Sequence, residues 1–480
     1  MQRTGFAQVR CTHPTLNRFV RYTSRMTYDE AKDWWFSRVN YELLSPEPSD
    51  LKLDRIRILL ERLGNPHQKL RIVHIAGSKG KGSTAAMLAA VFQSDGRRVG
   101  LFTSPHLESV EERIQVDGVP ISRAELASLM GDLRAAAAAP RPGSTAPLDA
   151  GLTFFEIVTA LGLAHFARRR ADIAVLEVGL GGRFDSTNIC DPLVSIITSI
   201  SFDHMQQLGN TLASIAFEKA GIIKPGRPVV SGVIRPEARA VIRQISRERQ
   251  AALREREVDF HYEHEPARIN GGQERWPRVR VSTWRGDGPW RELRLIGEHQ
   301  AANAAVAVAA VEVLREQGLP ISDRAVAAGL ARVRWPARLE IIARRPLVLL
   351  DCAHNVASAQ ALAQALVVSF PLAPNGRRLL IFAGNKDKDL SGMLAVLAPC
   401  IDHVFLTRFG NNPRCVPPER LAEILPEKLR RAATVCPDTT GALELARRSA
   451  GPDDLICAAG SVFLAGELRS LLVHDEIGPG

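Results

Sequence analysis

The sequence contains no long uninterrupted run of apolar residues, although 45% of its 480 residues are hydrophobic. A helix that spans a bilayer needs roughly 20 predominantly apolar residues, and a secretion signal needs a shorter apolar core near the start. Neither pattern is present. The sequence therefore argues against a membrane-spanning protein, and no membrane partner is expected.

Cysteine is scarce and irregularly placed. The chain has seven cysteines, an odd number, and none of them forms a C-x-x-C pair. Disulfide frameworks and cysteine metal sites depend on close, regular spacing. The pattern indicates reduced thiols and favours a cytoplasmic location.

Basic residues exceed acidic ones by ten, but they form no dense stripe with interleaved aromatic residues. A nucleic-acid-binding surface usually has such a stripe, so no nucleic-acid partner is expected. Half of the excess lies in residues 1–25, which lack Asp and Glu. We interpret this segment as a disordered Arg-rich tail or an over-long start before Met26. The alternative is a transit peptide, which would give an organellar location.

The stretch from Leu70 to Gln93 has the pattern of a buried strand, a glycine-rich loop and a helix. Apolar, β-branched residues come first, and apolar residues at helical spacing follow the loop. In such a loop backbone N–H groups point inward, and the helix N-terminus adds partial positive charge. The pattern predicts a loop that binds the phosphates of ATP through Gly77, Ser78, Lys79, Gly80, Lys81, Gly82, Ser83 and Thr84.

Within this loop Lys81 is the expected point charge for the β- and γ-phosphates, and a hydroxyl of Ser83 or Thr84 is expected to reach a magnesium ion. The usual phosphate loop has its hydroxyl directly after the lysine, whereas Gly82 intervenes here. This departure points away from P-loop NTPase switches, which remain an alternative, and towards one class of ligases.

Three other apolar strands end in groups that carry chemistry. Ser104 and His106 follow one strand, Glu177 ends a second, and His204 follows a third. Ligands of an open parallel sheet bind at the carboxyl ends of its strands, so these groups are expected near the phosphate loop. Ser104 offers an oxygen to a hard cation and His204 is a candidate metal ligand, whereas His106 is equally compatible with a structural role.

Alternating strands and helices predict an α/β fold with two domains. Residues 26–318 are predicted to form a doubly wound, mostly parallel sheet that carries the phosphate loop. Within them, residues 134–150 are rich in Ala, Pro, Gly and Ser and are interpreted as a low-complexity surface insertion. Residues 319–334 are predicted to be the hinge, and residues 335–480 a smaller Rossmann-like α/β domain.

Several sequence blocks, taken together in order and spacing, identify a family. The chain resembles the folylpolyglutamate synthase/dihydrofolate synthase enzymes, which are folate members of the Mur ligase superfamily, from Met26 to Glu467. The resemblance implies that the first domain is like the central domain of Mur ligases. The blocks are residues 74–84, 102–107, 112–114, 153–156, 177–188, 203–204, 218–226, 299–303, 335–340, 351–355, 386–389 and 460–461.

The resemblance assigns roles to matching residues. It implies that ATP is held by the phosphate loop with Asn303, Arg338, Asp351 and His354. It implies two Mg²⁺ ions, held by Ser83, Ser104, Glu156, His204 and Lys219. The implied catalytic residues are Lys81, Lys219 and His204. Substrate contacts are expected from Thr103, Pro105, His106, Phe155 and Ser461.

Lys219 matches a lysine that is carbamylated in relatives. The assignment has chemical sense, because CO₂ adds only to a neutral amine and a desolvated lysine loses its proton easily. The carbamate is an anion whose oxygens suit a hard cation. The alternative is an exposed lysine that pairs with the neighbouring Glu218.

The resemblance also implies the reaction. ATP phosphorylates a substrate carboxylate, and the amine of L-glutamate then displaces phosphate to form an amide. The carboxylate belongs to dihydropteroate, to a folate or to both, which the sequence leaves open, and a monomer is expected. Another Mur-type amino-acid ligase is the nearest alternative, although the blocks at 102–107 and 153–156 favour folate.

The chain departs from the family pattern at a few positions. Ser78 and Lys79 stand where Thr and Asn are usual, so that an amide is replaced by another cation near the phosphates. Cys352 and Val356 stand where Gly and Pro are common. These changes concern the local geometry of the loops more than the class of reaction.

Overall fold

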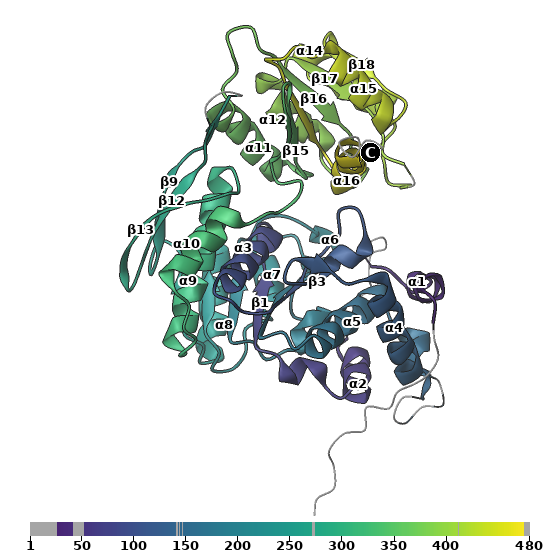
Figure 1. Ribbon diagram of the computed structural model, residues 1–480, viewed down its shortest axis with the longest axis vertical. Coiled ribbons are helices and arrows are strands. Elements are labelled where there is room, and N and C mark those ends of the chain that lie inside the picture. Colours follow the sequence, from purple (N-terminus) through teal and green to yellow (C-terminus); the bar gives the residue numbers. More distant parts are fainter. Residues whose placement is uncertain are drawn as a thin grey trace, which may run out of the picture.

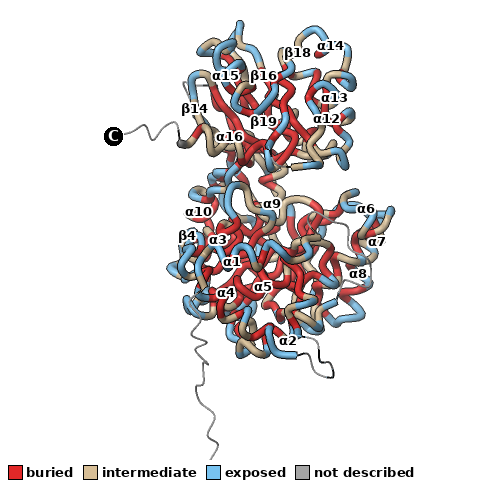
Figure 2. The backbone as a smooth tube through the Cα atoms, turned by 90° about the vertical axis from the view of Figure 1, so that its right-hand side faces the viewer, coloured by how far each residue is buried: buried red, intermediate tan, exposed pale blue. Residues whose placement is uncertain are grey.

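The computed structural model describes residues 26–41, 52–140, 143, 145, 147–270, 274–410 and 412–474. These residues form two lobes, one above the other in Figure 1, and buried backbone fills the centre of each lobe in Figure 2. The predicted tail, residues 1–25, lies outside the described residues. Among the described helices, none combines the length and the apolar character that crossing a membrane requires.

An eight-stranded sheet forms the centre of the lower lobe, in the order β4-β3-β2-β5-β1-β6-β7-β8. The strands from β2 to β8 in this order are parallel, and β3 and β4 extend one edge in antiparallel fashion. Most of the parallel strands are short and apolar, as strands covered on both faces are. Their bounds are β1 Ile72–Ala76, β2 Val99–Phe102, β3 Ile114–Val116, β4 Val119–Pro120, β5 Ile173–Glu177, β6 Val194–Ile197, β7 Val229–Ser231 and β8 Leu253–Glu255.

Helices cover both faces of this sheet, as the alternation of elements predicts. Val73 and Ile75 of β1 pack with α3, α9 and α10, whereas Ile72 packs with α2, α4 and α5, because side chains alternate along a strand. The lower-lobe helices are α1 Tyr28–Phe36, α2 Asp54–Arg62, α3 Lys81–Ser94, α4 Arg123–Ala138, α5 Phe154–Arg168, α6 Met205–Leu208, α7 Leu212–Ala220, α8 Pro236–Glu248, α9 Glu298–Glu316 and α10 Asp323–Arg332.

The end of α4 corrects the prediction of a surface insertion at residues 134–150. The helix continues to Ala138, and Ala136 and Ala137 are buried in the core of the lower lobe. Alanine has the highest helix propensity and its small side chain allows close packing, so the alanine run extends the helix. The predicted loop therefore begins about where the helix stops, at Ala139.

A small antiparallel sheet lies at one side of the lower lobe, and a hairpin follows its first strand. The sheet has the order β13-β12-β9, and β10 pairs with β11. Ala267 and Ile269 of the hairpin region are buried in the core of the upper lobe, so this segment crosses between the lobes. The bounds are β9 His261–Glu265, β10 Arg268–Ile269, β11 Glu274–Arg275, β12 Arg278–Thr283 and β13 Gly286–Glu292.

The upper lobe is built on a six-stranded sheet in the order β14-β15-β19-β16-β17-β18. All its strands are parallel except the edge strand β14. The strand bounds are β14 Glu340–Arg344, β15 Leu347–Leu350, β16 Arg378–Phe382, β17 His403–Leu406, β18 Ala433–Val435 and β19 Leu455–Ala459. The helix bounds are α11 Val356–Ser369, α12 Leu390–Leu397, α13 Pro418–Glu423, α14 Glu427–Arg430, α15 Thr439–Ser449 and α16 Val462–His474.

The connection between the lobes is shorter than the predicted hinge at residues 319–334. Most of that segment forms α10, which packs on α3 in the lower lobe. The two helices are so close that a Cβ added at Gly329 would lie 2.5 Å from the Cα of Val91. After α10 the chain crosses to the upper lobe again, through Val333 to Leu339, where the side chain of Leu339 joins the upper core.

Candidate active site

The phosphate loop joins β1 to α3 at the carboxyl edge of the lower sheet, as the sequence predicts. Gly77 and Gly80 adopt φ angles of 153° and 83°, which glycine tolerates best. A Cβ at Gly80 would overlap the side-chain amide of Asn303 in α9, and one at Gly82 would lie 2.9 Å from the ring of Trp335. Gly82 is the residue that distinguishes this loop from ordinary phosphate loops. Its lack of a side chain leaves room for the ring of Trp335, which leads into the upper lobe.

The segment after β6 holds the outer side of the loop. Ser78 N donates to the carbonyl of Ser199 at 2.8 Å, and Lys79 N donates to the Ser199 hydroxyl at 3.0 Å. The Ser78 hydroxyl donates to the carbonyl of Ser201 at 3.0 Å. These contacts fix the backbone of the loop against the strand end that carries Asp203 and His204.

Lys81 begins α3 and points its ammonium towards Glu177 at the end of β5, with 3.9 Å between Nζ and Oε1. The other carboxylate oxygen of Glu177 accepts a hydrogen bond of 3.2 Å from Ser104 N. Burial raises the pKa of Glu177, although Lys81 and Ser104 act in the opposite direction. Lys81, Glu177 and Ser104 thus form one cluster at adjacent strand ends.

The structure does not bring Glu156 into this cluster. Its carboxylate accepts hydrogen bonds from Arg55 Nε at 2.9 Å and from Thr153 N at 2.8 Å. It closes a capping box at the start of α5, an arrangement that satisfies free N–H groups of the first turn. Glu177, whose sequence position indicates only an acid at the end of a strand, lies beside Ser104 instead.

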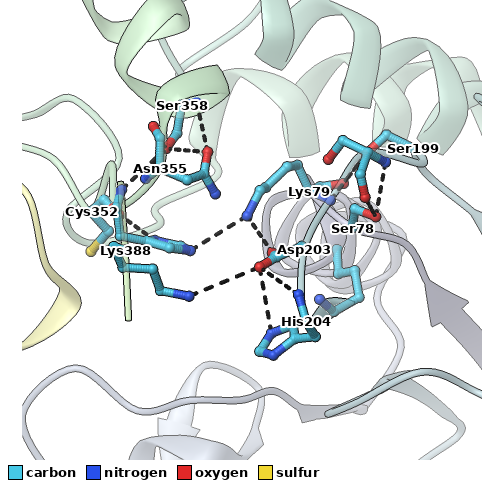
Figure 3. A network of polar contacts seen from close by, with 12 residues as sticks. Ser78, Lys79, Ser199, Asp203, His204, Cys352, Asn355, Ser358 and Lys388 are labelled. Carbon is cyan, nitrogen blue, oxygen red and sulfur yellow. Dashed lines mark hydrogen bonds and ion pairs between the residues drawn. The ribbon is translucent and has the colours of Figure 1, made fainter. Parts of the chain in front are cut away.

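A network around Asp203 joins the two lobes (Figure 3). Lys79 Nζ donates to Asp203 Oδ2 at 2.6 Å and lies 3.4 Å from Nε2 of His354, an upper-lobe residue. Lys388, which is also in the upper lobe, places its ammonium 4.0 Å from Asp203 Oδ1. Burial acts to raise the pKa of Asp203, but the cations around it, Lys79 first, lower it overall. Asp203 is therefore a carboxylate surrounded by cations from both lobes.

His204 and Lys219 adjoin this network from the lower lobe. His204 has a φ of 51°, precedes α6 and places Nε2 3.9 Å from Asp203 Oδ1. Lys219 in α7 is only 4% exposed, and burial, followed by repulsion from Lys81, lowers its pKa to about 7. Its neighbour Glu218 pairs with Arg183 at 2.7 Å at the surface. The alternative of an exposed Lys219 paired with Glu218 is therefore wrong.

Arg338 lies in the connection between the lobes, flanked by two residues with left-handed φ angles, Ala337 at 52° and Leu339 at 47°. Asp351 holds this backbone, because its oxygens accept hydrogen bonds from Leu339 N at 3.0 Å and Ala353 N at 2.8 Å. Arg338 interacts electrostatically with both Asp351 and Glu177. Asp351 therefore shapes the strained segment that brings Arg338 to the lower-lobe cluster.

The remaining predicted nucleotide contacts lie at the same junction. Asn303 packs on Gly80 and donates to the side chain of Gln300 at 3.0 Å. His354 Nδ1 is 2.8 Å from the carbonyl of Cys352. Cys352 replaces the common glycine, and its buried sulfur accepts a hydrogen bond from Arg338. Asn303, Arg338, Asp351 and His354 are thus gathered around the phosphate loop from α9, the connection and the upper lobe.

The predicted substrate contacts are more dispersed. Thr103 is buried directly after β2. In the loop that contains Pro105, His106 Nδ1 accepts a hydrogen bond of 2.9 Å from Arg113 Nε. Phe155 lies so close to Gly179 that a Cβ there would be 2.5 Å from its ring. Ser461 begins the last segment of the upper lobe, where its hydroxyl accepts a hydrogen bond from Phe463 N.

The side chains around the phosphate loop suit magnesium, whose ligands are hard oxygens. Ser104, Ser83 and the buried Glu177 supply oxygens, and the buried hydroxyl of Thr84 has no hydrogen-bond partner among the described residues. Within the same residues, no three His, Cys, Asp or Glu side chains form a group that could hold a metal alone. The set therefore fits a metal that also takes oxygens from nucleotide phosphates.

Comparisons with known proteins agree with this arrangement. Residues 75–311 match the model of the Mur ligase middle domain, and residues 337–462 match that of the Mur ligase glutamate ligase domain. The dihydrofolate synthase/folylpolyglutamate synthase of Bacillus subtilis is 35% identical over 454 residues, which cover 93% of this chain and 99% of the relative.

Solved structures that are similar to this chain come from the same family. The folylpolyglutamate synthase of Mycobacterium tuberculosis complexed with ADP has a TM-score of 0.81 and 33% identity, and covers 93% of this chain and 98% of its own. The Escherichia coli FolC structure in complex with DHPP and ADP has a TM-score of 0.79 and 29% identity, with coverage of 93% and 98%. The chain belongs to the folylpolyglutamate synthase/dihydrofolate synthase family of ATP-dependent Mur ligases.

Proposed function

We propose that this enzyme uses ATP to join L-glutamate to the carboxylate of dihydropteroate, of a folate, or of both, through an acyl phosphate. The observation that carries the proposal is the junction of the lobes. There Lys79 and Lys81 of the phosphate loop meet Arg338 and Lys388, with Glu177 and Asp203 between them. Such a group of cations suits the transfer of a phosphoryl group.

Phosphoryl transfer depends on positioning and on neutralising negative charge. Lys81 and the N-terminus of α3 would bind the transferred phosphoryl oxygens. Arg338, directed by Asp351, adds charge from the connection. Mg²⁺, held by Ser104, Glu177, His204 and oxygens of the nucleotide, would supply further charge neutralisation.

The second half of the reaction needs protection from water. The amine nitrogen of glutamate attacks the acyl carbon, the C–N bond forms, the C–O bond to phosphate breaks, and the amine loses a proton. An acyl phosphate exposed to water would instead be hydrolysed. Lys388 and His354 reach the lower-lobe cluster from the upper lobe, which supports a role for the lobe junction in excluding water.

We assign a carbamate to Lys219. Its pKa of about 7 leaves a substantial neutral fraction at physiological pH, and the neutral nitrogen can attack CO₂, form an N–C bond and release a proton. The resulting anion would reduce the excess of positive charge contributed by Lys79, Lys81 and Lys388. Intact-protein or peptide mass spectrometry after trapping of the carbamate would test the assignment, with Lys219→Met as the control.

The choice of substrates, the assembly and the location are also proposals. Relatives carry the names dihydrofolate synthase and folylpolyglutamate synthase, which supports activity on dihydropteroate and on folates. We expect a monomer in the cytoplasm. The described cysteines are free thiols, which supports a reducing compartment, and an organellar location remains the alternative.

The deciding experiment measures ADP release with dihydropteroate, dihydrofolate and tetrahydrofolate in turn, each with and without L-glutamate. We expect ADP release to require both the pterin carboxylate and glutamate, with one amide formed per ADP. ATP consumption that is indifferent to both substrates would contradict the proposal and favour a nucleotide-dependent switch.

A further inference from the structure

The last helix of the upper lobe contacts the lower lobe beside the loop that contains Ser104. Figure 1 shows α16 at the lower end of the upper lobe, facing the lower lobe. Arg469 of α16 is 24% exposed at its side chain and lies between two carboxylates. Its Nη1 donates to Glu108 in the lower lobe at 2.5 Å, and its Nε donates to Glu340 in β14 at 3.0 Å.

A second contact packs the same two elements closely together. The α16 backbone passes so close to the lower-lobe loop that a Cβ at Gly466 would overlap the carbonyl oxygen of Leu107. The Leu107 side chain packs against the upper core, and the Ser470 hydroxyl donates to Glu108 at 3.2 Å. The ion pair between Arg469 and Glu108 is therefore part of a closely packed contact between the two lobes.

The lower end of this contact is connected to Ser104 through residues 105–107. Glu112 accepts hydrogen bonds from Leu107 N and Ser109 N, both at 2.8 Å, and so holds the loop in a fixed turn. Ser104 N in turn donates to Glu177, the carboxylate beside Lys81. A shift of Glu108 would therefore be transmitted along a short, braced segment to Ser104.

The upper end is connected to Arg338. Glu340 Oε2 accepts a hydrogen bond of 2.8 Å from Ala337 N as well as the contact from Arg469. Ala337 and Leu339, on either side of Arg338, have the left-handed φ angles described above. Such conformations persist only where their surroundings hold them, and Glu340 is one of the groups that do so.

We propose that Arg469 is a positioning residue that couples closure of the lobes to the simultaneous placement of Ser104 and Arg338. Arg469 bridges the segment that carries Ser104 and the segment that carries Arg338, and it contacts no residue of the phosphate loop. The inference rests on the proposed ligation reaction. It predicts that loss of the bridge leaves ATP binding possible but exposes the acyl phosphate to water.

The experiment compares Arg469→Met with Glu108→Gln, which breaks the same bridge from the other lobe at a partly exposed position. We expect each variant to lower kcat/KM for glutamate-dependent ligation about tenfold and to raise the ratio of ADP released to amide formed. Arg469→Lys, which keeps the charge, should restore part of the coupling. Arg448→Met, which removes an exposed pair with Glu444 in α15, is the matched control and should change neither quantity.

The double variant tests whether Arg469 and Glu108 act through one bridge, and the ratio of ADP to amide separates positioning from general destabilisation. If Arg469 and Glu108 act through one bridge, Glu108→Gln should cost little in the Arg469→Met background, because the effects of directly coupled residues are not additive. An unchanged ratio of ADP to amide in both single variants, or full additivity in the double variant, would overturn the proposal. Ligation by the wild-type enzyme is measured in parallel, so failure of the proposed function itself would be visible there.

Discussion

The two halves of the candidate site are built in different ways. In the lower lobe, Lys81, Ser104 and Glu177 are placed by the backbone of parallel strands and of α3, with glycines required by close contacts. In the upper half, Arg338 and Lys388 lie on loops and reach the lower lobe through side chains. The lower half is thus fixed by the sheet, whereas the upper half depends on the relative position of the lobes.

The largest expected effect concerns the fixed half. Lys81→Ala should lower ligation by about a hundred- to a thousandfold, because a preorganised charge at the transferred phosphoryl group is lost. Glutamate-dependent ADP release measures the loss, and circular dichroism checks the fold. Lys428→Ala, whose ammonium contacts carbonyls in the upper lobe, is the control. Near-normal ligation by Lys81→Ala would refute the role.

Glu177 and Glu156, two buried carboxylates of the lower lobe, should respond differently when each is replaced by glutamine. Glu177→Gln should raise the Mg²⁺ concentration needed for half-maximal activity by tenfold or more, as loss of a metal ligand does. Glu156→Gln should leave this requirement unchanged but lower the free energy of unfolding by about 1 kcal/mol or more, since it weakens a buried hydrogen-bonded pair with Arg55. Magnesium titrations and urea unfolding measure the two effects. An equal magnesium requirement in both variants would remove the distinction.

For the half that depends on lobe position, Arg338→Lys should raise KM for ATP by about tenfold with a smaller change in kcat. Lysine keeps the charge but loses the planar guanidinium that interacts with both Asp351 and Glu177. Steady-state kinetics with saturating folate and glutamate measure both constants. A fall in kcat with KM unchanged would instead assign Arg338 to the transition state alone.

The smallest effect is one of pH. Burial lowers the pKa of Lys219 from 10.5 to about 7, so between these values the unfolded chain binds more protons than the folded one. The contribution of Lys219 to the free energy of unfolding should therefore rise with pH in this window. From pH 7 to pH 8, the wild type should gain about 1 kcal/mol relative to Lys219→Met in CO₂-free buffer. Urea unfolding at both pH values measures this difference, and a constant difference would contradict it.

Much of the upper lobe could be predicted from its sequence because its strands are apolar and separated by clear helix patterns. The sequence pattern predicts strands at residues 347–350 and 403–406 and a helix at 390–397, and β15, β17 and α12 have these bounds. The pattern of residues 418–429, taken alone, predicts a single helix. The structure instead divides this stretch into α13 and α14 before Pro426, since proline cannot continue a helix interior.

The charged stretch at residues 233–290 shows where the patterns fail. In β12, Val279 and Val281 are buried while Arg278 is exposed, which is the alternation of a half-buried strand. Frequent arginines hide this alternation when the sequence is read alone. The spacing of Thr153 and Glu156 was a different kind of signal, because it matches a capping box and could have identified the role of Glu156.

The contacts between the lobes have no sequence signal. Arg469 and Glu108 are 361 positions apart, and neither lies in a motif that predicts the other. The phosphate loop and its lysine could be predicted because they are local in sequence. Pairs such as Lys388 and Asp203 depend on how two independently patterned sheets are placed, which periodicity does not describe.

The hairpin formed by β10 and β11 gives the molecule a second physical tie. Ala267 and Ile269 are inserted among upper-lobe side chains although they belong to the lower part of the chain, and Glu274 pairs with Arg344. An upper lobe produced alone from residue 335 onward would expose the apolar surface that these residues cover. Residues 335–480 expressed alone should therefore aggregate, whereas co-expression with residues 1–334 should cover this apolar surface again.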